Sequence, residues 1–210
     1  LLYSLLGFFS ALILIPMPNQ KLPPVSPLSH NAVLDRDRHI GWLYAALIAI
    51  VTFISNGTST HLPEFIAAHG LPIAVGILWG VGQTGARFLE VASGYVLTPI
   101  RLTLLTVFFI PLCFALGISS THIGWAAGGF VLGYGAINGL TTVFKATLPL
   151  QLFAAEDYAR RTGVLLIPAQ LLAAASPFAY AWLNQTLGMQ GSLTVSAALA
   201  VIAAGLAVTI

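Results

Sequence analysis

Long apolar runs without a single Asp, Glu, Lys or Arg alternate with short polar segments along the whole sequence. The charge-free runs are residues 1–20, 39–63, 65–86, 102–144 and 162–210. The two longest are each interrupted once by a polar turn, at 117–122 and 184–190. About 20 apolar residues cross ~30 Å of hydrocarbon as a helix. The pattern therefore predicts an all-α integral membrane protein, a polytopic bundle of about seven transmembrane helices at residues 1–16, 40–62, 71–95, 101–117, 123–148, 162–184 and 190–210.

The basic residues occur in every second connection between these spans. They are Lys21, Arg36, Arg38, Arg87, Arg101, Lys145, Arg160 and Arg161. The intervening connections, at about 62–71, 117–123 and 184–191, contain neither Lys nor Arg. Because short basic loops remain in the cytoplasm, we expect residue 1 on the outer side of the membrane and Ile210 on the cytoplasmic side.

The composition excludes several other classes of protein. Hydrophobic residues make up 58% of the chain and charged residues 7%, whereas a soluble domain has about a quarter charged residues. A net charge of +2, with the basic residues confined to loops, argues against a nucleic-acid partner. Cys113 is the only cysteine, so an intramolecular disulfide is excluded, and no two histidines have the spacing of metal ligands. We therefore predict no metal and no other cofactor.

The ends of the chain and its longest polar segment suggest a part of a larger protein. The sequence starts at Leu1 inside an apolar run and has no Met there. Residues 17–39 hold several prolines, which oppose a regular helix, and then four alternating charges. We expect three parts: a transmembrane helix of a missing first half at 1–16, a cytoplasmic linker at 17–39, and a six-helix bundle at 40–210.

The predicted spans differ in polarity. Those at 1–16, 101–117 and 190–210 are almost wholly aliphatic apart from small hydroxyls. The other four carry amides, hydroxyls and charges at membrane depth. In hydrocarbon each such group needs a partner or a water-filled cavity. We therefore expect four helices to face an interior and three to face mostly lipid.

One helical face of the span at 71–95 collects small and polar residues at steps of three and four. They are Gly76, Gly80, Gln83, Arg87, Glu90 and Gly94. Glycines favour close helix packing in membranes. Arg87 and Glu90, at i and i+3, can pair, either as a structural ion pair or in contact with a substrate. Gln83, one turn deeper, is a candidate for a cavity lining.

The remaining polar spans each contribute further candidates. In the glycine-rich span at 123–148, Asn138, Thr142 and Lys145 share one face. Asn138 is either a partner in an interhelical hydrogen bond or a ligand contact. Lys145 can extend to the cytoplasmic interface. The amides of the other two polar spans are Asn56 and Gln170.

Six helices, four of them polar, after a lone helix and a long charged linker resemble the second half of a major facilitator superfamily transporter. The stretch from His61 to Leu71 looks like the outer end of the family's seventh helix and the turn into the eighth. The stretches 133–139, 147–150 and 158–163 are similar to the tenth helix and the following loop of bacterial members. Residues 94–101 stand where the family often repeats a loop motif, but the acidic residue and the first arginine of that motif are missing.

On this resemblance the predicted spans are the sixth to twelfth of twelve, and the chain works by alternating access about a site near the bilayer midplane. The implied partners are a small-molecule solute, a coupling proton or ion, the lipid bilayer and the missing first half of the same protein. The implied location is a bacterial inner membrane. The family's cavity is lined by helices that correspond to the four polar spans. Cavity candidates are Asn56, Gln83, Asn138, Thr142 and Gln170, and candidates for gating or coupling are Arg87, Glu90 and Lys145.

Two other classes of function make different predictions. An intact seven-helix receptor or accessory subunit shares the number of spans but predicts a start codon at Leu1, whereas the transporter predicts five more apolar spans upstream. An intramembrane enzyme needs a nucleophile and base or a metal set at membrane depth. The sequence has no paired carboxylates, no HExxH and no Ser/His/Asp cluster in these spans, so we predict no enzyme. The few charges on the inner faces are compatible with a neutral or weakly charged, partly apolar solute.

Overall fold

The computed structural model describes residues 30–93, 96–153 and 158–210, with only the backbone for 30–38, 159 and 160. By its internal contacts the chain divides into two units, Leu1–Val33 and Leu34–Ile210. Of the first unit only residues 30–33 are described. The predicted span at 1–16 and the prolines of the predicted linker therefore lie outside the described residues.

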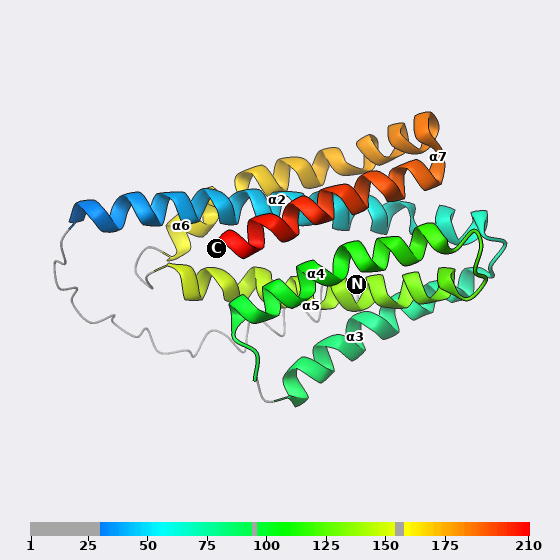
Figure 1. Cartoon of the computed structure of the whole chain (residues 1–210), viewed down its shortest axis with the longest axis horizontal. Coiled ribbons are helices and arrows are strands. Elements are labelled where there is room, and N and C mark those ends of the chain that lie inside the picture. The colour runs from blue at the N-terminus through cyan, green and yellow to red at the C-terminus, as the bar shows by residue number, and fades with distance from the viewer. Residues whose placement is uncertain (1–29, 94–95, 154–157) are drawn as a thin grey trace, which may run out of the picture. The chain divides into compact units, whose positions relative to one another are not determined.

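The described residues are helical almost throughout and contain no strand. In chain order the elements are α2 (His30–Ala68), the short 3-10 helix η1 (Ile73–Gly76), α3 (Ile77–Ala92), α4 (Pro99–Ser119), α5 (Ala126–Leu152), α6 (Tyr158–Leu165) and α7 (Ile167–Thr209) (Figure 1). The predicted all-α class is confirmed for this part of the chain.

Helix α2 begins at His30, inside the segment that the sequence predicts to be an irregular linker. That prediction is wrong for residues 30–39. The last proline before the helix is Pro27 and the next is Pro63, which lies near the helix end. Because no proline interrupts the backbone hydrogen bonding of residues 30–39, nothing there opposes a helix.

Local signals explain where helices start and stop. Thr98 caps the N-terminus of α4, with its Oγ1 accepting a hydrogen bond from the backbone N–H of Arg101 at 3.4 Å, and Pro99 occupies the first turn. After α2, Gly70 adopts a left-handed φ of 64°. The next amide, that of Leu71, then bonds back to the carbonyl of Ile66. This glycine-dependent turn ends the helix and starts the connection to η1.

Helix α7 is two helices joined at Gly188. This residue has φ 70° and ψ 176°, values outside the helical region that favour glycine. The first arm (residues 167–187) and the second arm (residues 189–209) run back alongside each other, drawn in orange and red in Figure 1. The arms correspond to the two spans that the sequence predicts at 162–184 and 190–210.

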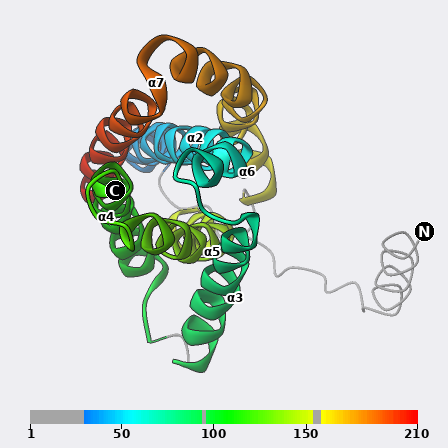
Figure 2. The same cartoon turned by 90° about the vertical axis from the view of Figure 1, so that its right-hand side faces the viewer.

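The helices of the unit Leu34–Ile210 pack along one another. Seen along their axes, α2 and α5 lie in the middle, with α3 beside α5 and the first arm of α7 beside α2 (Figure 2). Helix α4 packs against α5 and α7. Their inward faces bury an apolar core from α2, α4, α5 and α7. At its centre Phe130 of α5 lies within 4.9 Å of Phe65 and 5.7 Å of both Phe114 and Tyr134, measured between ring centroids.

Three helical segments of the described residues are long and apolar enough to cross a membrane. They are His39–Ala68, Pro99–Ser119 and Arg161–Thr209. The third contains the break at Gly188. Helix α3, at 16 residues, is shorter than a bilayer requires. The structure therefore shows a helical protein with three segments suited to a membrane. The number of about seven spans stays a prediction.

Three glycines bring the backbones of α3 and α5 into contact. A Cβ added at Gly82 would overlap the carbonyl oxygen of Leu132, and one at Gly135 would overlap the carbonyl oxygen of Trp79. A Cβ at Gly139 would lie 2.5 Å from the carbonyl oxygen of Gln83. We call Gly82, Gly135 and Gly139 the α3–α5 seam. Close packing through glycine is confirmed for α5.

On α3, however, the glycines that the sequence singles out do not form the seam. A Cβ at Gly80 would meet no atom within 4 Å, and one at Gly76 would only touch the end of the Ile66 side chain at 3.6 Å. The rotation of α3 about its axis turns Gly82 rather than Gly80 toward α5. Spacing alone cannot distinguish the two, because both are compatible with a small helical face.

Candidate functional site

Arg87 connects α3 to α5 at the end of the seam. Its Nε donates to the carbonyl oxygen of Gly139 at 3.3 Å, and its Nη2 donates to Oγ1 of Thr142 at 2.7 Å. The Thr142 hydroxyl in turn donates to the same Gly139 carbonyl at 2.7 Å. The close approach of the two backbones at Gly139 puts these acceptors within reach of the guanidinium. Two predicted site residues, Arg87 and Thr142, are thereby brought together.

Arg87 and Glu90 do not form the ion pair that their spacing permits. Within the described residues no ion pair joins them, and the Glu90 carboxylate bonds to no neighbour. The backbone carbonyl of Glu90 accepts a hydrogen bond from Ser93. The predicted pair is therefore corrected: Arg87 places its donors across the seam, where α5 offers a carbonyl and a hydroxyl.

We expect Arg87→Ala to weaken the packing of α3 against α5. Hydrogen bonds to a charged donor contribute roughly 1.5–3 kcal/mol, and this guanidinium is partly exposed, so the loss should be about 1–2 kcal/mol of unfolding free energy. This loss can be measured by unfolding the variant and its parent in mixed micelles with increasing amounts of a denaturing detergent. Glu90→Ala is the matched control on the same helix and should change stability by less than about 0.5 kcal/mol. Equal losses of stability in the two variants would indicate that Arg87 and Glu90 do form an ion pair.

Asn138 lies between α5 and α2. Its Oδ1 accepts a hydrogen bond from the Ser55 hydroxyl at 2.7 Å, and the Ser55 carbonyl accepts one from the Tyr134 hydroxyl at 2.8 Å. Of the two interpretations that the sequence leaves open for Asn138, this geometry is that of the interhelical hydrogen bond. Its amide nitrogen donates to no described side chain, so a ligand contact through that group stays compatible with the structure.

The other predicted site residues are spread over the unit. Asn56 on α2 and Gln170 on α7 are exposed, whereas Gln83, Glu90 and Lys145 are half-buried. The carbonyl of Lys145 accepts a hydrogen bond from the Tyr44 hydroxyl at 3.5 Å. No hydrogen bond among the described residues joins Asn56 or Gln170 to the Arg87 group. Hydrogen bonds therefore do not connect the whole predicted set within the described residues.

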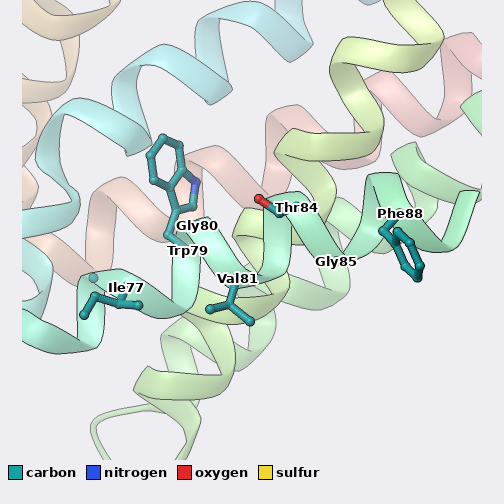
Figure 3. A pocket seen from close by; sticks show the side chains of 8 residues that line it. Ile77, Trp79, Gly80, Val81, Thr84, Gly85 and Phe88 are labelled. Atoms are coloured by element: carbon teal, nitrogen blue, oxygen red, sulfur yellow. The ribbon is translucent and has the colours of Figure 1, made fainter. Parts of the chain in front are cut away.

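A hollow lies on the outer side of α3. It has a volume of about 760 Å³ and is lined by Gly76, Ile77, Trp79, Gly80, Val81, Thr84, Gly85 and Phe88 (Figure 3). Ile77, Val81 and Phe88 are exposed there, and Thr84 is its polar side chain. Gln83 and Arg87 lie on a different face of α3 and do not line it. The hollow therefore includes Gly76 and Gly80 of the predicted face but not its polar side chains.

Compared with known proteins, the sequence matches no protein-family model and no curated protein. The function of the chain is therefore inferred from its own residues.

The exposed surfaces of the helices differ in polarity. Helix α4 exposes large apolar side chains along its length, and the second arm of α7 exposes apolar residues and single hydroxyls; these include Leu105, Phe108, Phe109, Leu112, Val201, Ile202 and Val208. The other helices expose amides, a guanidinium and hydroxyls as well as large apolar side chains; the polar ones include Asn56, Thr84, Arg87, Thr142 and Gln170, and the apolar ones include Ile77, Phe88, Leu171, Phe178 and Trp182. This division agrees with the polarity that the sequence predicts for the spans.

The described Lys and Arg gather toward one end of the unit. Arg101 lies in the first turn of α4, Arg161 in α6, and Lys145 in the last turns of α5. The hydrogen bond from Tyr44 to the Lys145 carbonyl places the start of α2 at the same end. The opposite end contains the α2–η1 turn, the α4–α5 turn and the break at Gly188, and its described residues include no Lys or Arg.

That opposite end holds a polar cluster of His61, Glu64, Asn184 and Ser192, none of which is among the predicted site residues. His61 and Glu64 of α2 pair at 3.0 Å, and the amide of Asn184 on α7 donates to the same Glu64 oxygen at 3.3 Å. The Asn184 Oδ1 accepts from the Ser192 hydroxyl at 2.5 Å. A histidine and a glutamate at i and i+3 near a helix end were a signal in the sequence. The partner on α7 was not, because it lies 120 residues from Glu64.

Proposed function

We propose that the chain is part of a secondary membrane transporter, built like the second half of a major facilitator superfamily protein, that moves a small solute by alternating access. The observation that supports this most is that the exposed polar groups of α2, α3 and the first α7 arm include amides and a guanidinium, whereas beyond Arg101 those of α4 and the second α7 arm are hydroxyls. In a bilayer, exposed amides and a guanidinium at membrane depth need water or protein beside them. The exposed side chains of α4 and of the second α7 arm need only lipid.

In this proposal α2, η1 together with α3, α4, α5 and each α7 arm cross the membrane once, preceded by a further span at 1–16. The basic end of the unit then faces the cytoplasm, since short basic segments remain there. This puts the end of the second arm in the cytoplasm and the His61 cluster on the outer side. The membrane would be the inner membrane of a bacterium.

The proposed polar lining comprises Asn56, Gln83, Asn138, Thr142 and Gln170. Arg87 ties α3 to α5 at the cytoplasmic side of this lining, and Glu90 and Lys145 lie near the same end. The other half of the cavity would come from the first half of the same protein. The solute is small, and a proton or ion couples its movement.

Cysteine accessibility tests the proposed arrangement in the membrane. In the full-length protein with Cys113→Ala, single cysteines replace Asn56 on α2 and Phe109 on α4, each in the middle of its helix. We expect a membrane-impermeant maleimide to label position 56 rapidly and position 109 hardly at all, because only the former borders water. Positions 170 and 201 form a second pair with the same expectation. Labelling of 109 and 201 at the rates of 56 and 170 would remove the distinction between a lipid face and a wet face.

Uptake of a panel of radiolabelled small solutes into vesicles tests the activity. Once a transported solute is found, we expect Asn138→Ala and Gln83→Ala each to reduce its uptake at least roughly tenfold, the effect of about 1.4 kcal/mol of lost binding. Gln185→Ala, an exposed amide at the turn between the α7 arms, is the control and should leave uptake unchanged. Full uptake in both cavity variants would exclude these residues from the site.

A further inference from the structure

Both ring nitrogens of His61 face oxygen acceptors. Nδ1 lies 3.0 Å from Oε2 of Glu64, and Nε2 lies 3.2 Å from the backbone carbonyl oxygen of Pro177 on α7. The same Glu64 oxygen already accepts a hydrogen bond from the Asn184 amide. A carbonyl oxygen can only accept, and so can an ionised carboxylate.

Both contacts of His61 can be hydrogen bonds only if the pair carries enough protons. A neutral imidazole has one N–H and one bare nitrogen. With an ionised Glu64, a neutral His61 would therefore point one lone pair at an oxygen lone pair. Both contacts become hydrogen bonds only with one proton more, carried either by an imidazolium or by a protonated Glu64 that donates to Nδ1. The arrangement can therefore make both hydrogen bonds when the pair holds this additional proton.

The pair fastens α2 to α7 on both sides of the break at Gly188. His61 contacts the first arm at Pro177, and Glu64 reaches Asn184, whose Oδ1 accepts from Ser192 at the start of the second arm. Each helix also contains a proline at this contact, Pro63 in α2 and Pro177 in α7. Because proline removes one backbone hydrogen bond from a helix, both are points where a helix can bend.

The surroundings add one other titratable group. Tyr180 of α7 stacks on His61 with ring centroids 6.3 Å apart, and its hydroxyl bonds to Ser196 of the second arm. Phe130 of α5 borders the same small space. Among the described residues no Lys, no Arg and no second carboxylate bonds to either member of the pair. Glu64 is 57% exposed, so protons from water reach the pair directly.

We propose that His61 and Glu64 form a proton-binding site that fastens the end of α2 to α7 when it holds one proton and releases it when that proton leaves. Raising the pH empties the site and leaves either Nδ1 or Nε2 without a hydrogen bond. The inference requires the described packing of α2 on α7. It does not require transport, but in a transporter it would make the proton the coupling or regulating ion.

Spin-label distances across the contact test this site. The full-length protein in nanodiscs, with Cys113→Ala, carries labels at Ala68→Cys on α2 and Gln185→Cys on α7, both exposed positions. Histidine in water changes charge between about pH 5 and 8. We expect a short, narrow distance distribution at about pH 5 and a longer, broader one at about pH 8.5. A distribution that does not change over this range would overturn the proposal.

Three variants separate the pair from other causes of a pH response. Glu64→Gln should give the same distance distribution at both pH values, because the glutamine amide donates to a neutral Nδ1 without an added proton, at the cost of the hydrogen bond from Asn184. His61→Phe should be unfastened at both. His122→Gln, which removes an exposed histidine of the α4–α5 turn, should keep the response of the parent. A pH response that persists in His61→Phe or disappears in His122→Gln would assign the effect elsewhere. If no solute is taken up but the spin-label distance still responds to pH, the transport proposal fails and the proton-binding site stands.

Discussion

Phe130→Ala is expected to be the most destabilising single substitution in the described bundle. The Phe130 ring is fully buried and contacts the rings of Phe65, Phe114 and Tyr134, which come from three helices. Its removal leaves a cavity where α2, α4 and α5 meet. In soluble cores Phe→Ala costs about 3–5 kcal/mol. We expect a loss near 3 kcal/mol, because in a bilayer the transfer part of that cost is small and the lost packing remains.

Phe109→Ala is the matched control for this substitution. Phe109 lies on α4 as Phe114 does, but it is 54% exposed and in our proposal faces lipid. Its truncation should change the unfolding free energy by less than about 0.5 kcal/mol. Detergent-induced unfolding followed by tryptophan fluorescence measures both variants. A comparable loss in the two would mean that Phe130 is not at the centre of a packed core.

Gly82→Ala is expected to disrupt the α3–α5 seam. The added methyl group would overlap the carbonyl oxygen of Leu132 and lie 2.9 Å from the backbone nitrogen of Ala136. Backbone atoms of α5 cannot move aside as a side chain can, so the two helices must separate. Overpacking costs typically 1–3 kcal/mol, and we expect the upper end, about 3 kcal/mol, in the same unfolding experiment.

Gly80→Ala distinguishes the seam from a general intolerance of α3 to larger residues. Gly80 is two residues away on the same helix, and a Cβ there would meet nothing within 4 Å. Because alanine is the better helix former by about 1 kcal/mol in water, this variant should be neutral or slightly more stable. Gly205→Ala on the second α7 arm, also without neighbours within 4 Å, should behave the same way. Loss of stability in all three variants would show that the seam is not the cause.

The helices could largely be predicted from the sequence, whereas several partners within them could not. The spans predicted at 40–62 and 101–117 lie inside α2 and α4, and the span at 123–148 overlaps α5 from Ala126 onward. The start of α2 differs from the prediction because the prolines of the segment 17–39 end at Pro27 and leave residues 30–39 free to form a helix. The Arg87–Glu90 pair was wrong because spacing along one helix shows which residues can meet and does not show what the neighbouring helix offers.

The sequence by itself determined the helical class, the approximate helix positions and which helices carry amides and charges. These depend on the local run of apolar side chains and on where charges interrupt it, which are properties of neighbouring residues. Only the tertiary structure decided that Gly82 contacts α5, that Arg87 bonds to Thr142, and that Asn184 joins His61 and Glu64. Those contacts depend on how each helix is rotated about its axis and on which helix lies beside it, and packing between residues far apart in the chain sets both.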